Sequence, residues 1–187
     1  MRSVTTIGLI RHFPVARGLP SRASMMTAAD VKSWYDEYER SDVIAKGVDL
    51  GGVDWRRCYA SSSPRAQQTA QAIFQGPIVE LDQLREPNIR QFDTGALKLP
   101  FAGWRWLLRL AWMTSHPSQR EVKTTFLSNI EGIIETLRSH APDPTLVVSH
   151  AGVMMFLRKA MLRRDFKGPR FAVPEPGRLY VFEGRWE

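Results

Sequence analysis

Residues 6–12 read Thr6-Ile7-Gly8-Leu9-Ile10-Arg11-His12, an apolar run that ends in an arginine and a histidine. A short apolar run bounded by a polar break is typical of a strand that is buried on both faces. Open α/β sheets hold their ligands in a crevice at the carboxyl ends of their strands. We therefore expect Arg11 and His12 to lie in such a crevice, at the end of the first strand.

Two further strand ends carry residues of the same kinds. The run at residues 145–149, Thr-Leu-Val-Val-Ser, is followed directly by His150. The run around residues 57–60 leads into Ser63-Pro64-Arg65, where serine and proline favour a helix start with Arg65 in its first turn. Because parallel strands end at a common edge, we expect the two arginines and two histidines to converge.

Four potential cations at one edge of a sheet would repel one another unless an anion lay among them. Phosphate suits such a site, because the planar guanidinium of arginine binds it through two parallel hydrogen bonds and a neutral imidazole can attack it. The free N–H groups at the helix start beside Arg65 also favour an anion. The pattern predicts a phosphate-binding site.

Four blocks of sequence follow one another in a characteristic order. They are Arg11-His12, Ser61-x-x-x-Arg65-Ala66-x-Gln68-Thr69-Ala70, Leu84-x-Glu86 and Val148-Ser149-His150-Ala151-Gly152. In order and approximate spacing the chain resembles the histidine phosphatase superfamily, the phosphoglycerate mutase-like group, over residues 4–183. The resemblance is to a phosphatase-type member.

The resemblance implies a role for each residue of the predicted site. His12 would be the nucleophile that becomes phosphohistidine. Arg11, Arg65 and His150 would bind the phosphoryl oxygens. Glu86 would be the proton donor.

Three further residues are candidates for the same site. Ala151 begins the next expected helix, so its backbone N–H could face the phosphate. Arg17 lies in the loop-like segment 13–26 and could line the substrate pocket or be a solvated loop arginine. Asp93 is an alternative acid to Glu86.

The chain departs from the family pattern directly after the expected nucleophile. The family usually has Arg-His-Gly, whereas this chain reads Arg11-His12-Phe13-Pro14. Proline fixes its own φ and favours an extended conformation for Phe13 before it. We expect a differently shaped loop, which leaves the identity of the substrate open.

Length and composition predict an ordinary globular protein. The 187 residues, 43% hydrophobic and 24% charged, are expected to form a single domain over residues 1–187. Strands that alternate with helices predict an α/β fold, a three-layer α/β/α sandwich with a largely parallel central sheet, phosphoglycerate mutase-like. The net charge of +7 suits an anionic substrate, but it would equally suit nucleic acid or an acidic membrane surface.

Several classes of protein are not expected. The single cysteine, Cys58, excludes an internal disulfide and a cysteine-based metal cluster. No apolar run approaches the roughly 18 residues of a transmembrane helix, and the N-terminus does not resemble a signal peptide. We expect a cytoplasmic protein without a membrane span, a metal site or a cofactor.

Two capping boxes predict helix starts elsewhere in the chain. Thr27-Ala28-Ala29-Asp30 should open a helix that runs to about Arg40. Ser118-x-x-Glu121 should open a second helix. Five apolar residues at helical spacing predict that this second helix packs on the core: Phe126, Ile130, Ile133, Ile134 and Leu137.

The segment at about residues 98–117 is unusual, because three of the six tryptophans fall there among arginines. It could be a helix whose inner face packs on the core. It could also be a lid over the catalytic crevice, or a basic amphipathic helix that touches a membrane surface or nucleic acid. We predict a lid-like segment. In the alternative of a helix packed on the core, the inner face consists of Trp104, Leu107, Leu108 and Ala111.

The sequence as a whole predicts a metal-independent phosphomonoester hydrolase of the histidine acid phosphatase type. It would act through phosphohistidine on a small anionic phosphate ester, with no nucleic acid as partner. One alternative is a catalytically impaired protein that binds phosphate esters, and another is phosphoryl transfer of the phosphoglycerate mutase type. A nucleic-acid-binding protein with an incidental pocket also stays open, as does the oligomeric state.

Overall fold

The computed structural model describes residues 3–87 and 94–186. The chain divides into two compact units, and each is described by itself. Unit 1 comprises Met1–Pro14, Val43–Glu86 and Ser128–Glu187, and unit 2 comprises Val15–Asp42 and Pro87–Leu127. The single domain and the lid-like role of residues 98–117 stay predictions.

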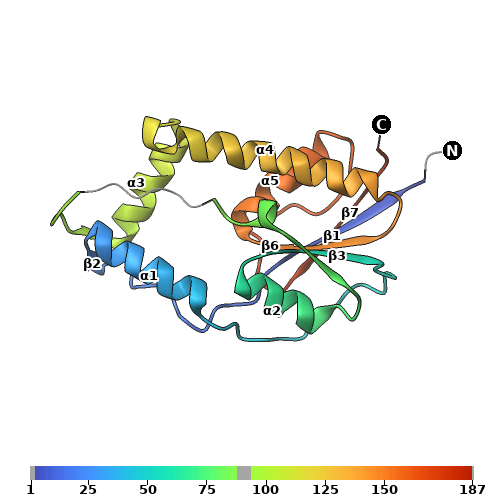
Figure 1. Cartoon of the computed structure of the whole chain (residues 1–187), viewed down its shortest axis with the longest axis horizontal. Helices are drawn as coiled ribbons and strands as arrows, with labels where there is room; N and C mark the ends of the chain where they lie inside the picture. The colour runs from blue at the N-terminus through green and yellow to red at the C-terminus, as the bar shows by residue number, and fades with distance from the viewer. Residues whose placement is uncertain (1–2, 88–93, 187) are drawn as a thin grey trace. The chain divides into compact units, whose positions relative to one another are not determined.

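Within the described residues, unit 1 is built on a five-stranded sheet with the order β4-β3-β6-β1-β7 (Figure 1). Four strands are parallel, and β7 joins β1 antiparallel. The predicted, largely parallel sheet is therefore confirmed. The strands are β1 (Thr5–Arg11), β3 (Arg57–Ser61), β4 (Ile78–Leu81), β6 (Thr145–Ser149) and β7 (Leu179–Gly184).

Helices cover both faces of this sheet. α2 (Pro64–Ile73) lies on one face, where its Ala66 and Ala70 pack against a buried apolar cluster from three strands. α5 (Ala151–Leu162) and the unit 1 part of α4 (Pro117–Ser139) lie on the other face (Figure 1). Successive strand side chains point to opposite faces, and the central strands β1, β3 and β6 are largely buried on both sides, whereas the edge strand β4 is partly exposed. This is the predicted α/β/α sandwich.

Unit 2 contains α1 (Ala28–Arg40), α3 (Phe101–Met113) and a two-stranded sheet of β2 (Met25–Met26) and β5 (Leu99–Pro100). The capping box at the start of α1 is confirmed. The Thr27 side chain accepts from the N–H of Asp30 at 3.1 Å, and the Asp30 carboxylate accepts from the N–H of Thr27 at 2.8 Å.

The tryptophan-rich segment forms α3, whose inner face is buried in unit 2. Trp104 donates from Nε1 to the carbonyl of Met26 at 2.7 Å, and Phe101 lies edge-on to Trp34. The predicted burial is right for Trp104, Leu108 and Ala111, whereas Leu107 is only half-buried.

The predicted cap at Ser118 is wrong, because α4 begins at Pro117. The ring of His116 caps the start of α4 instead, since its Nδ1 accepts from the N–H of Ser118 at 3.3 Å. The apolar face of α4 is as predicted: Phe126, Ile130, Ile133, Ile134 and Leu137 are all buried.

None of the helices in residues 3–87 and 94–186 combines the length and the apolar character that crossing a bilayer requires.

Candidate functional site

Three strand ends of unit 1 bring the predicted histidines and Arg65 together. β1 pairs with β6, and the N–H of His12 donates to the carbonyl of Ser149 at 2.9 Å, so the ends of these two strands lie side by side. His150 follows β6 directly. Arg65 lies in the first turn of α2, after β3, as the sequence predicts. All three side chains are buried.

The hydrogen bonds of His12 decide which of its ring nitrogens carries the proton. Nδ1 lies 2.7 Å from the carbonyl oxygen of Phe13, which can only accept, so Nδ1 is the protonated nitrogen. Nε2 therefore keeps its lone pair. It accepts a long hydrogen bond of 3.3 Å from Nε of Arg65.

The same argument places the proton of His150 on the other nitrogen. Nη2 of Arg65 lies 3.1 Å from Nδ1 of His150, and a guanidinium can only donate. Nε2 of His150 therefore donates to the hydroxyl of Ser61 at 3.0 Å. The two imidazole rings have their centroids 5.1 Å apart, and the guanidinium of Arg65 bonds to both rings.

Burial keeps both imidazoles neutral. Desolvation lowers the pKa of His12 to about 3, with the carbonyl of Phe13 opposing the shift and the charges of Arg65 and Arg11 adding to it. Desolvation, followed by the charge of Arg65, also lowers the pKa of His150 well below its usual value. At neutral pH the Nε2 lone pair of His12 is thus free of a proton.

Arg11 contributes a donor with unmet bonding capacity. Its Nη1 donates to the carbonyl of Pro174 at 3.1 Å, while its Nε is buried without a hydrogen-bond partner in the part of the chain described. A buried donor without an acceptor costs free energy, so an anionic oxygen that reached Nε would stabilise the site.

The unusual Phe13 is an integral part of the structure. Its N–H donates to Oγ1 of Thr69 at 2.9 Å, and that hydroxyl donates in turn to the carbonyl of Arg65 at 2.7 Å. Its buried ring lies against Gly177, where an added Cβ would come within 2.8 Å of Phe13 Cδ1. Gly177 also has a φ of +62°, which favours glycine.

Sequence reasoning missed the roles of Ser61 and Thr69, although both stand in the block that contains Arg65. Ser61 accepts from His150, and Thr69 ties α2 to the loop after His12. The motif contained both residues, but their partners lie in other elements of the fold.

Glu86 lies in the loop after a short 3₁₀ helix, η1 (Asp82–Leu84), and its side chain faces the start of α5. Oε1 accepts from the N–H of Gly152 at 3.2 Å, where the helix dipole favours a negative charge. Ala151, the first residue of α5, is adjacent to this contact and follows His150 directly. Glu86 is exposed, so water can reach its carboxyl group.

Two other candidates belong to unit 2. Arg17 belongs to unit 2, where it forms an ion pair with Glu37 at 2.6 Å. Asp93 lies outside the described residues. Among the residues described, no three histidine, cysteine or acidic side chains gather in a way that could hold a metal ion.

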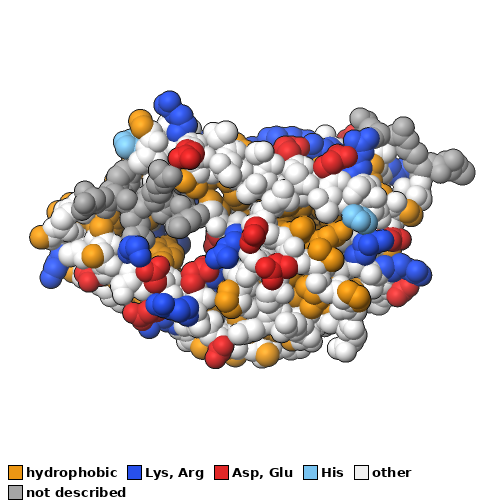
Figure 2. Space-filling view, in the orientation of Figure 1, with side chains coloured by type: hydrophobic (Ala, Val, Ile, Leu, Met, Phe, Trp, Pro, Cys, Tyr) orange, Lys and Arg blue, Asp and Glu red, His pale blue; other side chains and the backbone are white. Residues whose placement is uncertain are grey.

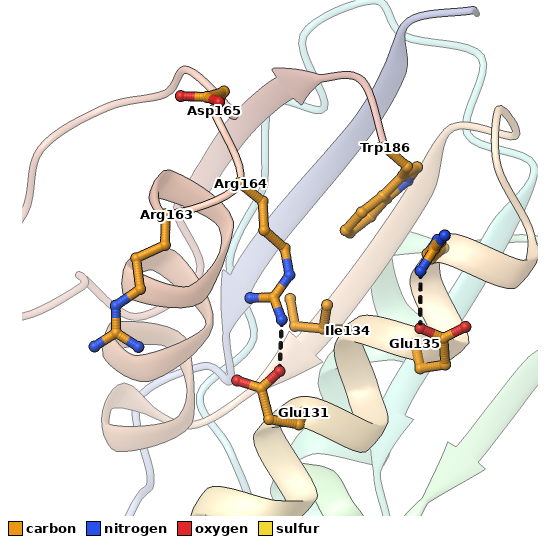
Figure 3. A pocket seen from close by; sticks show the side chains of 8 residues that line it. Glu131, Ile134, Glu135, Arg163, Arg164, Asp165 and Trp186 are labelled. Atoms are coloured by element: carbon orange, nitrogen blue, oxygen red, sulfur yellow. Dashed lines mark hydrogen bonds and ion pairs between the residues drawn. The ribbon is translucent and has the colours of Figure 1, made fainter.

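A separate pocket of about 260 Å³ opens beside the C-terminal part of α4 (Figure 3). Four of its charged residues form ion pairs: Arg164 with Glu131 at 2.6 Å, and Arg138 with Glu135 at 3.7 Å. Figure 2 likewise shows basic and acidic side chains next to one another over this end of α4. The pocket includes none of the clustered residues His12, Arg65 and His150.

A family model for the histidine phosphatase superfamily (branch 1) matches residues 39–185. The chain belongs to this superfamily. The matched region contains Arg65, Glu86 and His150 but begins after Arg11 and His12. The motif that departs from the family pattern thus lies outside the match.

Solved structures share the fold of this superfamily member along nearly its whole length. Mycobacterial hydrolase 2 is 14% identical with a TM-score of 0.57, and the match covers 100% of this chain and 84% of that one. The alpha-ribazole phosphatase from Shigella flexneri is 20% identical with a TM-score of 0.52, and the match covers 95% of this chain and 89% of that one. At these identities the likeness shows the fold alone. No curated protein gives a match.

The pKa of His12 predicts how the stability of the protein depends on pH. Between pH 6.5 and about 3 the unfolded chain binds more protons at this residue than the folded chain, so stability should fall as the pH is lowered through this window. The slope is at most about 1.4 kcal/mol per pH unit for each such histidine. Urea unfolding at pH 7, 6 and 5 should show a smaller slope for His12→Asn.

The control for this experiment is Ser128→Asn, at an exposed residue without a titratable group, which should keep the wild-type slope. Equal slopes for wild type and His12→Asn would contradict a buried neutral His12.

Thr69→Val should destabilise the fold by about 1–3 kcal/mol, because it leaves the buried N–H of Phe13 without an acceptor. The side chain keeps its shape, so packing changes little. Thr69→Ser keeps the hydroxyl and is the matched control, and urea unfolding at pH 7 measures both. A serine variant less stable than the valine variant would show that the methyl group, not the hydroxyl, matters here.

Proposed function

We propose that the protein is a metal-independent phosphomonoester hydrolase that acts through a phosphohistidine on His12. The observation that carries this proposal is the buried cluster in which His12 has a fixed tautomer and an unprotonated Nε2 that accepts a long hydrogen bond from Arg65. Membership of the superfamily supports a phosphatase or a mutase. The proposed substrate is a small anionic phosphate ester.

In the first step, Nε2 of His12 attacks phosphorus in line with the ester oxygen. The P–N bond forms as the P–O bond to the leaving group breaks. Arg11, Arg65 and His150 stabilise the charge that spreads over the equatorial oxygens. The unpaired Nε of Arg11 supports this role, because it lacks an acceptor within the described residues.

Glu86 is the proposed proton donor. Its carboxylic acid gives a proton to the leaving alkoxide, and the resulting carboxylate then takes a proton from water. That water attacks phosphorus, breaks the P–N bond and releases inorganic phosphate with neutral His12 restored. The contact with Gly152 at the start of α5 supports this assignment, because Ala151 and His150 belong to the same turn.

The rest of the substrate pocket belongs to the same proposal. Arg17 and the backbone N–H of Ala151 would contact the substrate, and residues 98–117 would cover it as a lid. The net charge of +7 supports an anionic substrate through long-range attraction. A cytoplasmic location also stays a prediction.

The first test is release of inorganic phosphate from a panel of phosphomonoesters in the presence of EDTA. The panel should include alpha-ribazole 5′-phosphate, because the Shigella flexneri relative is named for alpha-ribazole. His12→Ala should lower turnover at least about 10³-fold, since it removes the nucleophile. His140→Ala, at a histidine that follows α4 and belongs to neither the buried cluster nor the proposed lid, should leave turnover unchanged.

Two outcomes would overturn this proposal. Loss of activity in EDTA that added metal restores would exclude the metal-independent route. No turnover on any ester, with tight phosphate binding that His12→Ala weakens, would instead identify a phosphate-ester-binding protein whose loop at Phe13 has lost catalysis.

Glu86→Gln should slow the hydrolysis of alkyl phosphates by about 10²–10⁴-fold, because their leaving alkoxides need a proton. p-Nitrophenyl phosphate, whose leaving group is stable as an anion, should lose much less in the first step and show a burst of p-nitrophenol. His12 stays neutral down to about pH 3, so its Nε2 should remain a competent nucleophile at acidic pH. An alkyl phosphatase rate that Glu86→Gln leaves unchanged would count against Glu86 as the acid.

A further inference from the structure

The outer face of α3 carries an apolar strip that takes no part in the packing of unit 2. Trp106, Leu110 and Met113 are 71%, 57% and 65% exposed. They are spaced by four and three residues, so they lie along one side of the helix. The inner side of the same helix is buried through Phe101 and Trp104.

The helix that carries this strip is held firmly in unit 2. The N–H of Phe101 donates to the carbonyl of Ser24 at 2.8 Å, and the N–H of Ala102 donates to that of Arg22 at 3.1 Å. Trp104 adds its bond to Met26. The exposed strip is therefore a fixed feature of the fold, and large apolar side chains gathered on a surface typically mark an interaction site.

The strip is flanked by positive charge. Arg105 and Arg109 are exposed and lie one helical turn apart, and neither has an ion-pair partner within the residues that the structure describes. The whole stretch of residues 94–120 contains no aspartate or glutamate. Four acidic residues of unit 2 lie on α1, where Asp36 and Glu37 form ion pairs, while Asp42 follows α1 and Glu121 lies on α4.

We propose that α3 is an interfacial helix that binds the surface of an anionic phospholipid membrane. Trp106, Leu110 and Met113 enter the boundary between head groups and acyl chains, and the two arginines bind lipid phosphates. The indole of Trp106 suits this depth because its body is apolar and its N–H is polar. This inference does not rest on the proposed phosphatase activity.

The composition of this face of α3 favours a membrane over two other partners, nucleic acid and a second copy of the chain. Nucleic acid would use the arginines and the indole, but it has no apolar layer for Leu110 and Met113. A second copy of the chain, docked through the same face by a twofold axis, would bring the arginines of both copies together without a carboxylate from residues 94–120. An anionic bilayer meets both the charge and the apolar strip.

The test is co-sedimentation of the full-length chain with vesicles of phosphatidylglycerol and phosphatidylcholine, compared with vesicles of phosphatidylcholine alone. The chain should bind the anionic vesicles, and 0.5 M salt should weaken this binding. Arg105→Gln with Arg109→Gln should weaken it roughly 30-fold, since each basic residue near the surface contributes about one fivefold factor. Trp106→Ser, Leu110→Ser and Met113→Ser together should abolish it.

Matched controls distinguish loss of the α3 face from loss of net charge and from misfolding as causes of weaker vesicle binding. Arg163→Gln with Arg170→Gln removes the same charge from exposed positions of unit 1 and should weaken binding far less. Thermal unfolding should show every variant folded, because all the altered side chains are exposed. Binding of the wild-type chain to anionic vesicles tests the proposal even if a variant fails to fold.

Absence of wild-type binding to anionic vesicles at low salt would overturn the proposal. Vesicle binding that survives the triple serine substitution would overturn the assignment to α3. Binding of an oligonucleotide, or a dimer in light scattering, that the triple substitution removes while vesicle binding is absent would assign the face to nucleic acid or to self-association.

Discussion

The buried guanidinium of Arg65 is the interaction on which the rest of the site depends. It donates to Nε2 of His12 and to Nδ1 of His150, and its charge helps to hold both imidazoles in the neutral form. A buried cation is tolerated only where its donors meet acceptors. The two histidines supply acceptors as long as they stay neutral, so charge and protonation state support one another.

The sheet imposes the geometry of this arrangement. β6 lies between β1 and β3, so the residues that follow β1, β3 and β6 emerge at one edge. The first turn of α2 then brings Arg65 back over that edge. A change in strand order would separate the same residues, because each side chain is placed by the end of its own strand.

Phe13 shows how the fold accommodates a departure from the family pattern. Its carbonyl fixes the tautomer of His12, its N–H is paired with Thr69, and its ring is buried against Gly177. A carbonyl can accept from Nδ1 whatever side chain its residue carries. The large side chain therefore changes the packing around the nucleophile loop while this backbone contact is kept.

The amino-acid sequence by itself determined the class of fold, the strand ends and the residues placed there. These follow from local rules: buried strands read as apolar runs, and serine with proline opens α2. The same rules fixed both ends of α1, where the cap lies within the helix's own first turn. They placed the start of α4 wrongly, because the helix already begins at Pro117, where the ring of His116 accepts from the N–H of Ser118 itself.

Only the tertiary structure decided how those residues are paired. The partners of Arg65 lie 53 and 85 positions away along the chain, and the bond between Phe13 and Thr69 spans 56 positions. The tautomer of His150, the unpaired Nε of Arg11 and the exposed strip of α3 follow from such distant packing, whereas the carbonyl of the adjacent Phe13 sets the tautomer of His12. The pattern of residue types does not predict these features, because the elements that pack together in the fold determine hydrogen-bond direction and burial.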